Sequence, residues 1–263
     1  MTEVHPTTLV SGEVDIAEGV RVGPFTEIMG PVRIGEGTCI DGHCRIEGPV
    51  EIGKHNRIHA FCSLGTPPQD LKYGGEPTRL VIGDHNTIRE FSTFNRGTVG
   101  GGGITTVGSR CLFMAYSHVA HDCHVEDFVI FANAGTLAGH VHVGHHATIG
   151  GFSAVHQFCR VGPYAFVGGF AALTRDVLPY MKTLGIRNGS RTYGPNLIGL
   201  RRQGFSEERL DALKKAYRVL FRQTDKVKNL SLALKELEET VPLTEDVRLL
   251  VDFIRSSKRG VIR

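Results

Sequence analysis

The sequence has little of what marks several large classes of protein. No two of its six cysteines have CxxC spacing, which argues against a zinc finger. No apolar run approaches the roughly 18 residues of a membrane span, and the N-terminal segment MTEVHPTTLV lacks the regions of a signal peptide. The net charge is +3 and the first half of the chain has no basic run, which argues against nucleic-acid binding. This mild positive charge suits a small anionic substrate. We therefore expect a cytoplasmic protein that binds neither nucleic acid nor the membrane interior.

Apolar residues recur at every sixth position through most of the chain from Val4 to Leu173. A helix repeats at about 3.6 residues and a strand at 2, so a strict period of six indicates a hexapeptide β-helix. With three hexads per coil, the repeat predicts a parallel β-helix of about nine coils. The longest unbroken series consists of Val107, Phe113, Val119, Val125, Phe131, Leu137, Val143, Ile149, Val155, Val161, Val167 and Leu173.

Two segments interrupt the period, and two residue types recur at fixed places within it. Residues 65–79 (GTPPQDLKYGGEPTR) and 95–103 (NRGTVGGGG) are predicted to be loops leaving the prism, the first replacing part of a coil.

Five cysteines fall four positions after an apolar residue, where a small buried thiol fits. Glycine often follows the apolar residue directly, which predicts corners with positive φ there. These glycines are Gly23, Gly35, Gly53 and Gly65.

The period changes after Leu173. Residues 174–205 lack a clear pattern and are expected to be irregular. Helical spacing then begins after Ser206, an expected N-cap, continues at about residues 230–240, and resumes after Thr244, another expected cap. We predict a β-helix domain at residues 1–190 and a small all-α domain at residues 191–263, whose helices pack on the prism end or on a neighbouring subunit.

Polar residues converge within the longest unbroken part of the repeat. Because three hexads make one coil, Gly139 is expected beside His121, His140 beside Asp122, and His156 one coil further on. An imidazole can take a proton near neutral pH, and a carboxylate can orient it. A glycine exposes its backbone N–H, which can hold an oxyanion. Together these groups suggest acyl transfer to a hydroxyl.

Two other functions fit the same cluster. Three histidines with an open position can hold a catalytic zinc, as in the gamma-class carbonic anhydrases, which are also trimeric β-helices. The chain could instead be a catalytically silent scaffold. The stacking of residues does not decide between these possibilities.

Specific segments along nearly the whole chain resemble one family. They include HPTTLV, QDLKYGGEPT (69–78), HVAHDC (118–123), AGTLAGHV (134–141), AVHQF (154–158), RRQGFS (201–206) and RGVIR (259–263). The chain resembles the UDP-N-acetylglucosamine O-acyltransferases, which start lipid A synthesis. The resemblance implies a left-handed β-helix, a helical C-terminal domain and a homotrimer with sites between adjacent prisms. It also implies transfer of an (R)-3-hydroxyacyl chain from acyl carrier protein to the glucosamine 3-hydroxyl, without metal or cofactor.

The resemblance also assigns roles to residues. His121 would be the general base, Asp122 its partner and Gly139 the oxyanion donor, while Gly169 would limit acyl length, leaving room for a longer chain. The other site positions would contact the sugar nucleotide or the phosphopantetheine arm, and they are Asp70, Lys72, His118, His140, His156, Gln157, Asn196 and Arg202.

The chain departs from the family pattern at two nucleotide-contacting positions. Ile198 stands where an acidic residue is common, and Gln203 where a second arginine is common. A 3-amino sugar acceptor, or an acetyl-CoA-dependent sugar-nucleotide acetyltransferase, therefore stays an alternative. The sister N-acyltransferase, which carries an extra N-terminal uridine-binding domain, fits less well because the hexads begin at Val4.

Overall fold

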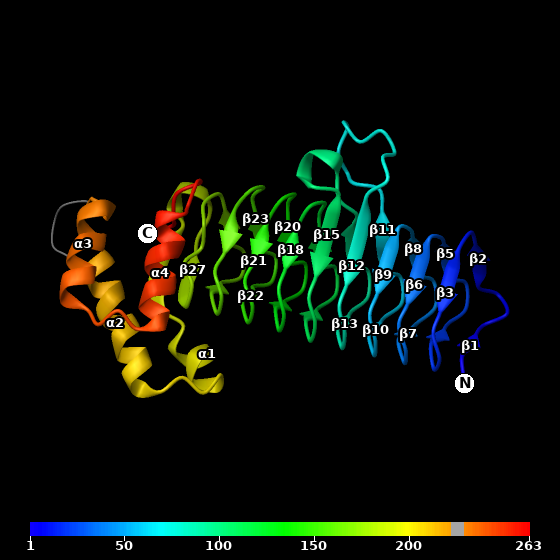
Figure 1. The fold of residues 1–263 in the computed structure, drawn as a ribbon, viewed down its shortest axis with the longest axis horizontal. Helices are drawn as coiled ribbons and strands as arrows, with labels where there is room; N and C mark the ends of the chain where they lie inside the picture. Colours follow the sequence, from blue (N-terminus) through cyan, green and yellow to red (C-terminus); the bar gives the residue numbers. More distant parts are fainter. Residues whose placement is uncertain (222–228) are drawn as a thin grey trace.

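The computed structural model describes residues 1–221 and 229–263, and its main body is a left-handed parallel β-helix (Figure 1). The three walls of this triangular prism are three sheets, which we call A, B and C. Successive strands of the chain lie in successive sheets, so each coil contributes one short strand to each wall. The expected β-helix is confirmed.

Sheet A is the longest wall. Its strands are β1 (Glu3–Val4), β4 (Arg21–Val22), β7 (Cys39–Ile40), β10 (Arg57–Ile58), β13 (Thr87–Ile88), β16 (Leu112–Phe113), β19 (Ile130–Phe131), β22 (Thr148–Ile149), β25 (Phe166–Val167), β27 (Met181–Leu184) and β28 (Arg191–Pro195). All pairs are parallel except β27 with β28.

Sheets B and C complete the prism. Sheet B consists of β2 (Leu9–Ser11), β5 (Glu27–Met29), β8 (Arg45–Glu47), β11 (Ser63–Thr66), β14 (Thr93–Asn95), β17 (His118–Val119), β20 (Thr136–Leu137), β23 (Ala154–Val155) and β26 (Ala172–Leu173). Sheet C consists of β3 (Val14–Ile16), β6 (Val32–Ile34), β9 (Val50–Ile52), β12 (Arg79–Ile82), β15 (Ile104–Val107), β18 (His124–Val125), β21 (His142–Val143) and β24 (Arg160–Val161). We call the three edges where these walls meet AB, BC and CA.

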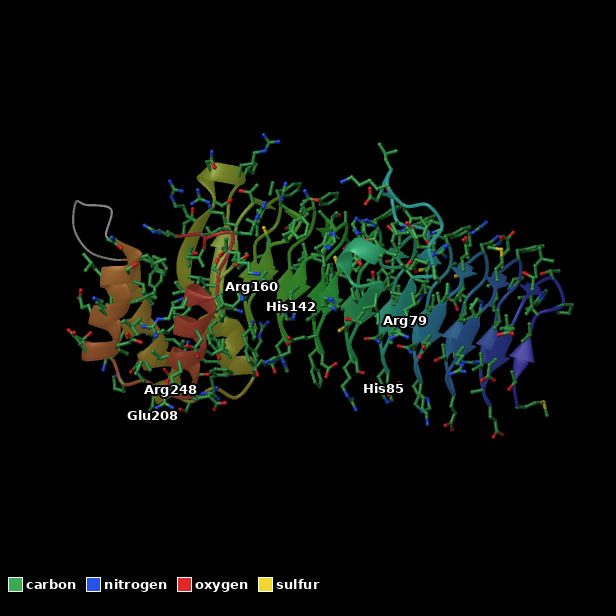
Figure 2. All side chains as sticks on the ribbon, turned by 45° about the horizontal axis from the view of Figure 1, so that its top comes forward. Arg79, His85, His142, Arg160, Glu208 and Arg248 are labelled. Atoms are coloured by element: carbon green, nitrogen blue, oxygen red, sulfur yellow. The ribbon has the colours of Figure 1, made fainter. Side chains whose placement is uncertain are left out.

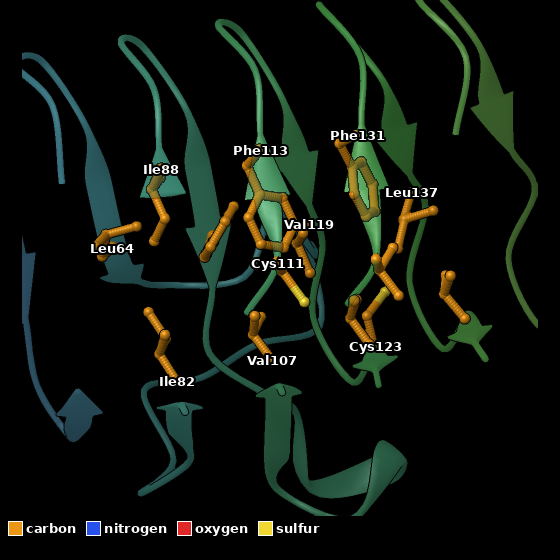
Figure 3. Close-up of a cluster of buried hydrophobic side chains, with 14 of the residues drawn as sticks. Leu64, Ile82, Ile88, Val107, Cys111, Phe113, Val119, Cys123, Phe131 and Leu137 are labelled. Carbon is orange, nitrogen blue, oxygen red and sulfur yellow. The ribbon is translucent and has the colours of Figure 1, made fainter. Parts of the chain in front are cut away.

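The residues at the sixth positions form the core of the prism. Nearly all are buried, and the largest, Phe94, Phe113 and Phe131, are fully enclosed. Figure 3 shows Phe113 and Phe131 within this core. Stacking coil on coil in this way removes a continuous apolar column from water. Five cysteines line the same core as free thiols, as expected, and they are Cys44, Cys62, Cys111, Cys123 and Cys159. Polar side chains such as His85, His142 and Arg160 lie on the outside (Figure 2).

The edges turn differently from the prediction. At a regular corner the residue with positive φ is the third after the apolar residue, as at Asp122 (φ 58°) and His140 (φ 61°). Of the four predicted glycines, Gly65 (φ 77°), where the first loop leaves the prism, has positive φ, and the other three do not. Glycine follows the apolar residue for another reason. A Cβ at Gly23 would lie 2.6 Å from the Gly42 nitrogen, and one at Gly35 would lie 2.6 Å from the carbonyl carbon of Gly53, so the coils are too close there for a side chain.

Both interruptions of the period are insertions at edge BC. Regular coils pair residues exactly one coil apart, as Ile40 pairs with Ile58. Ile58 then pairs with Ile88, and Ile88 with Phe113, and both of these steps along the chain are longer than the regular one. The first loop therefore adds twelve residues and does not replace part of a coil. The second, which contains the 3₁₀ helix η1 (Val99–Gly101), adds seven. Both project from the same side of the prism (Figure 1).

The prediction of irregular structure at residues 174–205 was wrong. Strand β27 continues sheet A by one more coil, which makes about ten coils instead of nine, and β28 returns antiparallel to it. This hairpin crosses the predicted domain boundary at residue 190, and the 3₁₀ helix η2 (Arg187–Gly189) lies at its tip. The hexad period did not predict β27, because this strand lies outside the hexad register.

In the described part of the chain, four helices close the end of the prism, of which the sequence predicted three. They are α1 (Leu197–Arg202), α2 (Glu207–Phe221), α3 (Leu230–Thr240) and α4 (Glu245–Arg255). The caps are as predicted: Ser206 Oγ accepts from the Arg209 N–H, and Thr244 Oγ1 accepts from the Val247 N–H. Leu178 and Met181 of the last coil share a core with α2, α3 and α4, which confirms packing on the prism end. No described helix has the length and apolar character needed to cross a bilayer.

Candidate active site

A histidine and a carboxylate form a close pair on edge BC, between β17 and β18. His121 Nδ1 lies 2.7 Å from Asp122 Oδ2, and the Asp122 side chain is fully buried. A carboxylate only accepts hydrogen bonds, so Nδ1 carries the proton and Nε2 keeps its lone pair. The pair therefore presents a basic nitrogen on the outer side of the edge.

The second inserted loop holds the carboxylate in place. Thr98 donates to Asp122 twice, from its N–H to Oδ1 (2.8 Å) and from its hydroxyl to Oδ2 (2.6 Å). The Asp122 N–H donates to Thr105 Oγ1 at 2.8 Å. A Cβ at Gly101 would overlap the Asp122 carboxylate, so the loop backbone passes directly over it. Sequence reasoning missed Thr98, although it lies in the predicted loop at residues 95–103.

Gly139 lies against the imidazole of His121. A Cβ on Gly139 would be 2.5 Å from His121 Cε1 and 2.7 Å from Nε2, so only glycine leaves this imidazole in place. Nothing in residues 1–221 or 229–263 accepts a hydrogen bond from the Gly139 N–H. Residues at the same place in other hexads share this free N–H, but among the described residues Gly139 is the one that places it beside the histidine of a histidine–carboxylate pair. The expected stacking of His121 and Gly139 is confirmed.

His140 joins the pair from the next coil. Its imidazole meets that of His121 edge-on at 5.0 Å between ring centres and stacks on Phe158 at 4.3 Å. Burial lowers the pKa of His140, while the charges of Asp122 and Asp70 oppose that fall. Asp70 belongs to the first inserted loop, so the charge of this loop acts on the same histidine.

The first inserted loop is anchored by a residue that sequence reasoning did not single out. Arg96 donates to the backbone carbonyls of Gly48 (3.0 Å) and Gly65 (2.8 Å) and, through Nε, to the Tyr73 hydroxyl (3.1 Å). Within the loop, the Lys72 N–H donates to Asp70 Oδ1 at 3.0 Å, and Lys72 itself is exposed. The loop therefore has a fixed base and presents a free ammonium group at its surface.

His118 lies next to this cluster on sheet B. Its Nδ1 is 2.7 Å from Thr93 Oγ1, and burial lowers its pKa, with the nearby His121 adding to the fall. Burial likewise lowers the pKa of His124, His140 and His146. In the unfolded chain these groups bind protons below about pH 6.5, while the folded chain resists protonation.

We therefore expect the stability of the protein to be lost in mild acid. The contribution of these histidines is present above about pH 6.5 and falls as the pH drops through their lower folded pKa. Urea unfolding at about pH 7.5 and 5.5 measures this loss. The His118→Asn variant should lose less stability between the two pH values than the natural protein. An equal loss in both would show that His118 does not contribute.

The remaining predicted residues lie in three places. His156 and Gln157 are exposed on edge BC, one coil beyond Gly139. Gly169 is exposed beside Phe170 on edge AB, at the far side of sheet B. Asn196 and Arg202, in contrast, belong to α1 on edge CA.

The contacts of α1 define its place on edge CA. Asn196 caps the helix by accepting from the Gly199 N–H and donates to the Tyr164 carbonyl. Arg201 is paired with Glu207 at 2.8 Å, whereas no described residue forms a hydrogen bond or ion pair with the Arg202 side chain. One chain therefore does not bring these two residues to His121, which lies on a different edge.

The side chains of His121, Asp122 and His140 offer ligand atoms within 4.8 Å of one another, the one such group among the described residues. The 2.7 Å separation of His121 from Asp122 is a hydrogen-bond distance, and both Asp122 oxygens already accept from Thr98. The Asp122 oxygens, which would have to bind a metal, are thus already engaged in hydrogen bonds. This arrangement fits a proton-transfer site better than a metal site.

The hexapeptide coils and this histidine–carboxylate pair define a hexapeptide-repeat acyltransferase. Comparisons with known proteins agree. Residues 31–66 match the pattern described as bacterial transferase hexapeptide, and residues 176–262 match that described as UDP N-acetylglucosamine O-acyltransferase, domain 2. The chain belongs to the UDP-N-acetylglucosamine O-acyltransferase family.

Individual relatives cover the whole chain. The acyl-[acyl-carrier-protein]–UDP-N-acetylglucosamine O-acyltransferases of Alkalilimnicola ehrlichii and Thiobacillus denitrificans are 52% and 48% identical over 263 residues, all of both chains. The crystal structure of the UDP-N-acetylglucosamine O-acyltransferase from Moraxella catarrhalis is 43% identical with a TM-score of 0.92 and covers 99% of each chain. The Arabidopsis UDP-N-acetylglucosamine acyltransferase is 34% identical with a TM-score of 0.83, covering 100% of this chain and 98% of its own.

Proposed function

We propose that this enzyme transfers an (R)-3-hydroxyacyl chain from acyl carrier protein to the 3-hydroxyl of UDP-N-acetylglucosamine. Its relatives are named for an acyl-carrier-protein donor and this sugar nucleotide. The observation that carries the proposal is the His121 base, oriented by Asp122 and lying against the bare amide of Gly139. Such a transfer would begin lipid A synthesis, and we propose that it takes place in the cytoplasm.

The reaction follows from these groups. His121 Nε2 takes the proton of the sugar hydroxyl as its oxygen attacks the thioester carbonyl carbon. Negative charge develops on the carbonyl oxygen, and the Gly139 N–H donates to it. When the carbon–sulfur bond breaks, the thiolate of the carrier leaves and takes the proton back from His121. Asp122 stabilises the imidazolium in between. These residues supply the whole step without a cofactor.

The surrounding residues suit the two substrates. Arg202, which lacks a partner in the described structure, offers a forked donor for the pyrophosphate, and Lys72 offers a second charge. Asp70, His118 and His140 provide polar contacts for the sugar beside the base. On the other side of Gly139, His156 and Gln157 would bind the phosphopantetheine arm.

We propose further that the active unit is a homotrimer. Edge AB carries a ladder of exposed, stacked rings, including Phe61, Phe91 and Tyr116 with ring centres 5.0 Å apart. An exposed aromatic stripe of this kind is typical of an interface. If edge AB lies on a threefold axis, sheet B of one subunit packs on sheet A of the next. Edge BC then meets edge CA of the neighbour, which brings Arg202 to the His121 of another subunit.

Gly169 lies on edge AB, directly before the exposed ring of Phe170. An acyl chain that starts at Gly139 and follows sheet B inward would end at edge AB. A Cβ at Gly169 would meet only the Gly151 carbonyl, at 3.3 Å, so a larger side chain there would project into that path. Glycine at this position supports acceptance of a long chain.

Mixing two inactive variants tests the shared site. His121→Ala and Arg202→Ala change opposite sides of the proposed interface. When equal amounts of the two variants assemble at random into trimers, about a quarter of all interfaces keep both natural residues, so activity should return to about that level. Light scattering of the same sample gives the mass of the assembly. A mixture no more active than its parts would mean that each chain holds a complete site.

The reaction itself is tested by mass spectrometry of the products. The enzyme is incubated with UDP-N-acetylglucosamine and a panel of (R)-3-hydroxyacyl carrier proteins of different chain length, with acetyl-CoA as an alternative donor. The corresponding 3-amino sugar nucleotide is the alternative acceptor. Product with acetyl-CoA alone would contradict the proposed donor, preference for the amine would contradict the acceptor, and stoichiometric zinc in the active protein would contradict the mechanism.

A further inference from the structure

The segment RGVIR at residues 259–263 is tied firmly to the prism. Ile262 packs in the core of the β-helix, and Val261 packs in the core shared with the helices. Asp176 pairs with the segment through two backbone hydrogen bonds of 2.9 Å, donating to the Gly260 carbonyl and accepting from the Ile262 N–H. Thr192 adds a third contact, its hydroxyl donating to the Ile262 carbonyl at 2.8 Å.

The residues just before this segment are also fixed. The buried carboxylate of Asp176 accepts from Ser257 Oγ at 2.8 Å and from Arg160 through its backbone N–H (2.8 Å) and Nε (3.2 Å). Gly260 has φ +72°, a conformation that favours glycine and turns the chain towards the prism. The backbone of Arg259 is thus held from both sides while its side chain stays exposed.

The Arg259 side chain reaches the candidate active site. Its Nη2 lies 3.0 Å from His156 Nδ1. A guanidinium can only donate, so Nδ1 of His156 must be the acceptor and the proton of the ring must be on Nε2. The Gln157 carbonyl lies near the same nitrogen at 3.2 Å and would need the opposite tautomer. We place the ring proton of His156 on Nε2 because the contact with Arg259 is the shorter of the two and its donor is permanently charged.

A thiol completes the surroundings of the guanidinium. Arg259 also interacts with Cys159, whose pKa burial raises, so this partner is a neutral thiol that does not compete for the charge. The arginine is therefore free to act on His156. His156 itself lies one coil beyond Gly139, on the side away from the first inserted loop and its Asp70 and Lys72.

We propose that Arg259 is a positioning residue for the acyl donor, which fixes His156 as a neutral ring that donates through Nε2. The proposal rests on the proposed function. A phosphopantetheine arm carries amide carbonyls that accept such a hydrogen bond, whereas the sugar nucleotide binds on the other side of Gly139. Loss of Arg259 would therefore weaken the binding of the acyl donor. It would leave the base, His121, paired with Asp122 as before.

Substitutions at neighbouring positions test this role. Arg259→Ala should raise the KM for the acyl carrier protein about tenfold, the effect of one charge-assisted hydrogen bond, and change kcat and the KM for the sugar nucleotide less than twofold. Lys258→Ala removes one positive charge from the next exposed position and should behave like the natural protein. Arg259→Lys should restore part of the effect. Equal losses in the Lys258 and Arg259 variants would reduce the role to general charge attraction and overturn the proposal.

Two further measurements separate this proposal from the function on which it rests. In a His156→Ala background, Arg259→Ala should add nothing, since its effect passes through that ring. Nitrogen-15 NMR of histidine-labelled protein should show His156 with an unprotonated Nδ1, and Arg259→Ala should change that signal. An altered signal without any acyl transfer would mean that the reaction was wrongly assigned. An unchanged signal, or additive losses, would overturn the role of Arg259.

Discussion

Replacing His121 with alanine should lower kcat/KM by about a thousandfold, within the range typical of a lost general base. The imidazole is the group whose basic nitrogen lies against the Gly139 amide, and its position comes from the 2.7 Å contact with Asp122. The side chain is not part of the prism core, so the mass of the assembly and the urea midpoint should be unchanged. Steady-state rates with both substrates, measured beside light scattering, check the result.

The matched control is another histidine–carboxylate pair on the same prism. His142 lies 2.8 Å from Glu126 on sheet C, exposed and without a bare glycine beside it. His142→Ala should keep the natural rate. If His121→Ala retained more than a tenth of the natural turnover, another group would have to serve as the base.

The second large effect is expected at Gly139. Alanine there would place a Cβ 2.5 Å from His121 Cε1, so the imidazole must rotate away from Asp122 or the coil must shift. Either movement displaces the base by about an ångström or more, which typically costs about a hundredfold in rate. We expect kcat to fall by that factor while the overall fold, followed by circular dichroism, is kept.

A glycine at the same place in another hexad provides the comparison. A Cβ at Gly151 would meet the Asn133 carbonyl at 3.5 Å, an ordinary contact, and this residue lies on edge AB. Gly151→Ala should fold and turn over like the natural protein. A Gly139→Ala enzyme with a normal rate would show that the imidazole does not occupy this place during the reaction.

The sequence predicted the parts of the structure that depend on a constant coil length. Three hexads per coil put His121 against Gly139 and His140 beside Asp122, and the structure has these contacts. The buried cysteines followed from the same register. Such predictions succeed because stacking in a β-helix converts a difference in residue number directly into a position in space.

Contacts that leave the repeat could not be predicted in this way. The two hydrogen bonds from Thr98 to Asp122 depend on the path of a glycine-rich loop, which no period encodes. Strand β27 extends sheet A outside the hexad register, and α1 is only six residues long. The separation of Asn196 from His121 within one chain likewise depends on this final segment. The family resemblance indicated these residues but not which edge they occupy.

The regular pairing on both sides of the two edge-BC loops has an evolutionary consequence. Ile58, Ile88 and Phe113 stay in register although twelve and then seven residues leave the wall between them. Closing a longer loop costs only about 0.6 kcal/mol for each doubling of its length. Selection can therefore lengthen, shorten or recompose the first loop with little cost in stability, whereas Thr98 and Gly101 of the second must keep their place at the buried Asp122 carboxylate. New acceptor preferences can arise on an old scaffold, because the parts that recognise the ligand vary independently of those that keep the protein folded.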